Sequence, residues 1–110
     1  MRIPSATDIM VDQIVEIAAS PVVLMILEAG NELSGVLEGL MKLAAEDWDD
    51  QIIFLKVWAD EHPTLMEQLH VVELPAVLIY CQRRRYAQHT GVPSARELTN
   101  LLDGALKVNR

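Results

Sequence analysis

The stretch that decides the fold is Val71-Val72-Glu73-Leu74-Pro75-Ala76-Val77-Leu78-Ile79-Tyr80, an apolar run with a proline inside it. Proline has no backbone N–H, so a strand tolerates it at the first position but not in the middle of a sheet. Pro75 therefore marks the start of a strand. Because the residues that follow are apolar without alternation, both faces of this strand are expected to be covered, which is typical of an inner strand in an α/β sheet.

The chain before this strand carries the pattern of a βαβ unit. Two short, continuous apolar runs at 22–27 and 52–58 predict buried strands. Between them, apolar residues recur every three or four positions over 34–47, which predicts an amphipathic helix. A strand, a helix and a strand over this length are expected to place the two strands parallel in one sheet.

The elements on either side of the Pro75 strand are shorter. Asp60 and Pro63 open a short helix, since proline is accepted in a first helical turn. After the strand, the polar link 82–84 is too short for a crossover connection. The next segment, 85–90, is therefore expected to pair antiparallel with the Pro75 strand.

Both ends of the chain are expected to be helical. Helical spacing over 5–18 predicts a first helix, with Ser5 and Asp8 as a weak capping pair. The residues expected to face inward from it are Ile9, Met10, Ile14 and Ile17. Ser94 and Glu97 have the spacing of a capping box and precede a single apolar stripe, which predicts a C-terminal helix.

Composition and charge limit the classes of function. The chain has 110 residues, 51% of them hydrophobic, which predicts a single domain spanning 1–110 with a substantial core. A formal net charge of -7 repels polyanions, so we expect no nucleic-acid partner and no membrane partner. The apolar run at 22–27 is also far shorter than the roughly 20 residues that cross a bilayer. With one cysteine and no basic-then-apolar leader pattern at its start, the chain is expected to be cytoplasmic.

The order of elements, together with single residues, resembles the thioredoxin family. Residues 23–106 align with a typical bacterial pattern of that family without a gap. The residues that coincide with common family residues are Lys56, Asp60, Pro63, Pro75, Gly91, Leu98 and Asp103. The resemblance implies a thioredoxin fold, with a central mixed sheet of four to five strands, helices on both faces and a cis proline at Pro75.

The resemblance fails where the family has its chemistry. In place of Cys-Gly-Pro-Cys the chain reads Asn31-Glu32-Leu33-Ser34, and Met25 stands where many members have a buried aspartate. Dithiol exchange requires one thiolate to attack and a second to resolve the mixed disulfide. The chain is therefore similar to a redox-inactive thioredoxin-like protein, and we expect neither dithiol–disulfide oxidoreductase activity nor a cofactor.

The resemblance also implies a binding groove beside Pro75, where the backbone of Leu74 would pair with an extended segment of another protein. The candidate groove residues are Asn31, Glu32, Leu33, Ser34, Leu74, Pro75, Gly91 and Val92. The leading hypothesis is a non-catalytic protein-binding module, such as an assembly factor, chaperone-like holdase or adaptor. The alternative is that the proline now serves only the scaffold.

Asn31 and Ser34 are predicted to cap the helix rather than to catalyse a reaction, because no base lies near them in the sequence. Glu32 then suits the positive end of the helix dipole. The histidines lie on different elements, and no pair has metal-ligand spacing, so no metal is expected; they are His62, His70 and His89.

Cys81 is predicted to be a buried, inert thiol at the end of the Pro75 strand. An alternative function is a thiol-dependent oxidoreductase, or a redox-regulated protein, that acts through Cys81 alone. A thiol at the end of a strand lacks the helix N-terminus that lowers a catalytic pKa. The first interpretation is therefore preferred.

Arg83, Arg84 and Arg85 are the only basic cluster of the chain. They are interpreted either as a solvated turn or as a docking patch for an acidic partner or a phosphate. The acidic segment 46–50 is expected to solvate the loop after the long helix. Such separated opposite charges would also suit a head-to-tail homodimer.

Overall fold

At the centre of the structure lies β1 (Val22–Leu27), a strand whose six residues are all buried. The structure is a computed structural model, and it describes residues 3–109. The other elements, in chain order around β1, are α1 (Asp8–Ile17), α2 (Glu32–Trp48), β2 (Ile53–Trp58), η1 (Ala59–Glu61), α3 (Pro63–Leu69), β3 (Ala76–Cys81), β4 (Arg84–Thr90) and α4 (Ala95–Val108).

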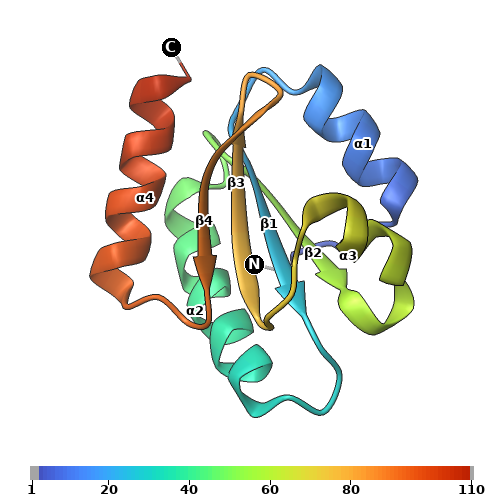
Figure 1. Cartoon of the computed structure of the whole chain (residues 1–110). Coiled ribbons are helices and arrows are strands. Elements are labelled where there is room, and N and C mark those ends of the chain that lie inside the picture. The colour runs from blue at the N-terminus through green and yellow to red at the C-terminus, as the bar shows by residue number, and fades with distance from the viewer. Residues whose placement is uncertain (1–2, 110) are drawn as a thin grey trace.

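The strands form one mixed sheet in the order β2-β1-β3-β4. β1 pairs parallel with β2, as the βαβ pattern predicts, and antiparallel with β3. β3 in turn pairs antiparallel with β4, so the hairpin prediction is confirmed. As Figure 1 shows, α2 and α4 cover one face of this sheet, while α1 and α3 cover the other.

Alternating residues of β1 enter two separate cores. Val23 and Met25 pack with α2 and α4, in a cluster that includes Leu37 of α2. Leu24 packs on the other face with α1 and α3, in a cluster that includes Leu65. A strand that is apolar on both faces must be covered on both, which explains the three layers.

The first helix differs from its prediction at its start. The structure begins the helix at Asp8, and Thr7 is the N-cap, with its hydroxyl accepting a hydrogen bond from the N–H of Met10. Ser5, which was expected to cap, instead forms a parallel bridge with Lys56 of β2. The backbone of residues 4–6 is tied to β2, because Ala6 donates to the Lys56 carbonyl at 2.8 Å.

The inward face of α1 was also predicted wrongly in part. Ile9 is 66% exposed and Ile17 is 79% exposed, whereas Val11 is buried and Ile14 and Val15 pack on the core. The attachment of the preceding segment to β2 fixes the direction in which the chain enters the helix. The helix therefore presents the Val11 side to the sheet.

The C-terminal helix begins as predicted. The Ser94 hydroxyl accepts from the Glu97 N–H and the Glu97 carboxylate accepts from the Ser94 N–H, both at 3.0 Å. These hydrogen bonds with Ser94 lower the pKa of Glu97, because they favour its charged form.

Within residues 3–109, none of the helices has the length and apolar character that crossing a bilayer requires.

A pair of leucines on α2 tests the packing. Leu37→Ala removes a fully buried side chain and is expected to lower the free energy of unfolding by about 2–5 kcal/mol. Leu43→Ala makes the same chemical change at a position that is 64% exposed, and is expected to change it by only about 0.5 kcal/mol or less. Urea unfolding measures both. Equal losses would contradict the orientation of α2.

Candidate functional site

The turn that opens α2 is built by Asn31. Its side-chain oxygen accepts a hydrogen bond from the Leu33 N–H at 3.0 Å, which satisfies one of the free amides of the first turn. The capping role predicted for Asn31 is confirmed. Because Asn31 is the cap, the helix begins at Glu32 rather than at Ser34, two residues earlier than the apolar pattern predicts. Glu32 is exposed in the first turn.

Ser34 faces the interior. It is a buried polar residue, and its hydroxyl oxygen accepts a hydrogen bond from the backbone N–H of Glu28 at 3.0 Å. The hydroxyl thus ties the start of the loop after β1 to the first turn of α2. Ser34 does not cap the helix as predicted, because Asn31 is the N-cap and Ser34 lies inside the first turn, and its burial takes it out of the candidate groove.

The loop before β3 lies beside this turn. The Leu74–Pro75 peptide bond is cis, Pro75 is buried and Leu74 is half-buried. The Asn31 side-chain amide donates to the Leu74 carbonyl at 3.5 Å, and the Gly91 N–H donates to the Pro75 carbonyl at 2.7 Å. Gly91 has φ of 84°, a left-handed conformation that glycine adopts without strain. These hydrogen bonds bring the α2 turn, the loop before β3 and the end of β4 together.

We call this region the cis-proline surface and define it by Asn31, Leu33, Leu74, Pro75, Gly91 and Val92. Leu33 is 53% exposed, whereas Leu74 and Val92 are half-buried and pack on the two cores. Within residues 3–109, no hydrogen bond uses the Leu74 N–H. The surface therefore offers an exposed apolar side chain and a free backbone donor.

Behind the surface the core is apolar. Met25 is fully buried and lies opposite Lys56 in the register of β1 and β2. The charge of Lys56 is met by Glu38 of α2, whose carboxylate lies 2.7 Å from the ammonium group. The ammonium group of Lys56 is thus paired with a carboxylate from α2.

The lone thiol lies at the other end of β3. Cys81 is buried, as predicted, and its sulfur donates to the Ala105 carbonyl of α4 at 3.5 Å. Burial raises the pKa of the Cys81 thiol, which disfavours the reactive thiolate. Six residue steps along β3 separate it from Pro75, a distance of about 20 Å. The thiol therefore cannot act at the cis-proline surface.

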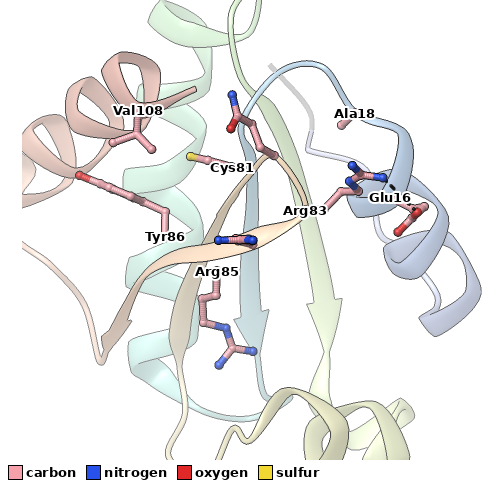
Figure 2. A pocket seen from close by; sticks show the side chains of 9 residues that line it. Glu16, Ala18, Cys81, Arg83, Arg85, Tyr86 and Val108 are labelled. Atoms are coloured by element: carbon pink, nitrogen blue, oxygen red, sulfur yellow. Dashed lines mark ion pairs between the residues drawn. The ribbon is translucent and has the colours of Figure 1, made fainter. Parts of the chain in front are cut away.

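The arginines line the pocket drawn in Figure 2, which also shows the ion pair of Arg83 with Glu16. Arg83 pairs with Glu16 of α1 at 3.6 Å, where both side chains are exposed. The Arg85 guanidinium donates to the Leu69 carbonyl at 2.7 Å and to the Tyr80 hydroxyl at 2.9 Å. Arg85 is thus held by the end of α3, while all three arginines line one pocket, so the docking patch stays a prediction.

The hairpin itself is tighter than predicted. Only Gln82 and Arg83 form the turn, with φ of 52° and 70°, and Arg84 already belongs to β4, where it pairs with Cys81. Positive φ at both central residues is the geometry of a two-residue hairpin turn.

Among residues 3–109, no three His, Cys, Asp or Glu side chains gather closely enough to hold a metal ion.

Comparisons with known proteins bear on the fold. No protein-family model matches the chain, and no curated protein sequence matches it. Among solved structures, the chain is similar to chloroplastic thioredoxin z, whose crystal structure defines a novel type-specific target recognition. The two share 14% sequence identity with a TM-score of 0.86, over 98% of this chain and 96% of that chain. The chain therefore has a thioredoxin-like fold, and the predicted α/β architecture is confirmed.

Substitutions in the α2 turn test the structural roles of its polar side chains. Ser34→Ala leaves the Glu28 N–H without its acceptor and is expected to lower the free energy of unfolding by about 1–2 kcal/mol. Asn31→Ala removes the cap and is expected to cost about 1 kcal/mol. Glu32→Gln, at an exposed position of the same turn, is the control. Urea unfolding in which both alanine variants matched this control would contradict these roles.

The reactivity of Cys81 tests its burial. Alkylation by iodoacetamide at neutral pH is expected to be far slower in the folded protein than in urea, because the thiol is covered and its pKa is raised. The rate in the folded protein should increase as the pH rises. Mass spectrometry follows the reaction, and equal rates in the two states would show that the thiol is accessible.

Proposed function

We propose that this chain is a non-catalytic protein-binding module that holds an extended segment of another protein at the cis-proline surface. One observation supports this proposal most. Where a thioredoxin has its two thiols, Asn31 and Ser34 are engaged in hydrogen bonds that build the turn. The surface around them keeps an exposed apolar side chain, Leu33, and the unused N–H of Leu74.

Dithiol exchange is disfavoured by the number of cysteines and by the burial of Cys81. The chain has one cysteine, while exchange through a mixed disulfide needs a second thiol to resolve it. The Cys81 thiol is buried with a raised pKa, so it is also a poor nucleophile on its own. A redox role through Cys81 therefore has no support from the site.

The binding mode follows from the backbone beside Pro75. An extended peptide that runs along Leu74 can accept from its N–H, in the manner of a strand added to a sheet edge. The Leu74 carbonyl already accepts from Asn31, but at 3.5 Å, and a carbonyl oxygen has a second lone pair for a peptide N–H. Leu33 and Val92 would contribute apolar contact on the two sides of the peptide.

Such a module fits an assembly factor, a chaperone-like holdase or an adaptor, acting in the cytoplasm. The similar chloroplastic thioredoxin z is described by its target recognition. Recognition of a target needs the shape of the surface and its backbone groups, and these do not depend on sulfur. A thioredoxin-like fold that has lost both thiols can therefore still bind polypeptide.

The proposal predicts where peptides bind. Short synthetic peptides of varied sequence, added to the ¹⁵N-labelled protein, are expected to shift the amide signals of Leu33, Leu74 and Val92. Leu33→Asp places a charge on an exposed apolar contact and should weaken binding by about tenfold or more. This variant should fold normally, since an acid in the first helical turn suits the dipole.

The matched control is Ile9→Asp, which adds the same charge at an exposed residue near the start of α1, on the other face of the sheet. It should bind peptides as the wild type does. If both variants bind equally, or if the shifted signals lie away from the cis-proline surface, the proposed function is wrong.

A further inference from the structure

A second surface lies on the side of α2 that faces away from the sheet. Leu37, Met41 and Ala45 form the buried side of this helix. On the other side, Val36 is 57% exposed and Leu43 is 64% exposed. These two are seven positions apart, so they lie on one side of the helix, with Gly39 between them. We call Gly35, Val36, Gly39 and Leu43 the α2 outer face.

Two glycines inside this helix are not required by close packing against other parts of the chain. Gly35 and Gly39 are exposed, and a Cβ added at either would meet nothing within 4 Å. Glycine inside a helix is less stable than alanine, so its presence twice in α2 weakens the helix. Residues four apart lie on the same side, and together these glycines leave a shallow strip where another backbone can approach closely.

The charges around the α2 outer face are mainly acidic. Glu32 lies in the first turn and Asp47 in the last, and Asp49 and Asp50 follow the helix, all of them exposed. The last turn has no basic residue, and the carbonyl end of the helix dipole adds further negative potential there. Lys42 is the sole basic residue of α2.

These charges disfavour a second copy of the chain as the partner. In a parallel pair of α2 helices, the acidic C-terminal end of one helix would lie against the same acidic end of the other. In an antiparallel pair, Glu32 of one copy would lie near Asp47 of the other. Each chain also carries a net charge of -7, which adds repulsion over the whole molecule.

We infer that the α2 outer face binds an amphipathic helix of another protein. The apolar stripe of that helix would pack on Val36 and Leu43 and cross the glycine strip, and its Lys or Arg residues would lie near Asp47, Asp49 and Asp50. This is helix-in-groove recognition, which differs from the addition of an extended strand at the cis-proline surface. The inference stands on residues of α2 and the loop after it, so it does not rest on the proposed function.

The test uses two synthetic helical peptides and the full chain. Both peptides have leucines on one side; the first has lysines on the other side, and the second has glutamates in their place. Calorimetric titration is expected to show binding of the lysine peptide only, weakened by added salt because the attraction is partly electrostatic. In the ¹⁵N-labelled protein, the shifted signals should be those of Val36, Gly39 and Leu43.

Variants separate loss of binding from loss of fold. Gly39→Gln fills the strip with a side chain while it favours the helix, so it should raise the Tm and weaken binding of the lysine peptide. Leu43→Gln should weaken it about tenfold or more, the loss expected for one buried leucine. Ile17→Gln removes an even more exposed apolar side chain from α1 and should leave binding unchanged.

Four results would overturn the inference. The first is equal binding of both peptides, or of neither. The second is unchanged affinity in Gly39→Gln. The third is a dimer in sedimentation experiments that Gly39→Gln abolishes, which would make a second copy the partner. Shifts confined to Leu33, Leu74 and Val92 would also exclude the α2 outer face while leaving the proposed function intact.

Discussion

The burial of β1 on both faces is the constraint on which the rest of the structure depends. None of its six residues can reach water, so the sheet must be covered on both sides by helices. The same strand decides where the candidate site forms. Because β1 and β3 are antiparallel, with Ile26 opposite Ala76, the end of β1 lies beside the start of β3. The turn into α2 and Pro75 are therefore neighbours, although they are far apart in the sequence.

The polar groups at this meeting point are used to build it. Asn31 caps α2 and reaches the Leu74 carbonyl, while Ser34 is buried against the loop after β1. Side chains that are fixed in this way stabilise the shape of the surface. The surface presents an apolar side chain and a backbone N–H to the outside, and both are used in the recognition of extended peptides.

Much of the fold is predictable from local patterns, because it depends on them. Continuous apolar runs mark the buried strands, and the capping box of Ser94 and Glu97 acts over three residues. What the sequence does not reveal depends on distant contacts. The orientation of α1 is set by the pairing of Ser5 with Lys56, and no periodicity within residues 5–18 reports that pairing. The place of Arg85 is set by the Leu69 carbonyl at the end of α3, a contact across the sheet edge.

The candidate site was predictable in composition but not in geometry. The resemblance to thioredoxins pointed to its residues, and the side-chain types at Asn31 and Ser34 indicated capping, which the structure shows for Asn31 alone. The exposure of Leu33 and the partial use of the Leu74 carbonyl depend on how α2 meets the loop before β3. The helical period over 34–47 does not by itself tell which side of α2 is covered. Val36 belongs to that period, yet its side chain faces away from the sheet.

If this thioredoxin-like fold binds polypeptide without sulfur chemistry, as proposed, the protein should not catalyse dithiol–disulfide exchange. The most direct test is the catalysed reduction of insulin by dithiothreitol, measured for the wild type and for Cys81→Ser beside a thioredoxin with both thiols. The account predicts that neither form of this protein accelerates the reaction, while the thioredoxin does. Turnover by the wild type that is lost in Cys81→Ser would contradict it.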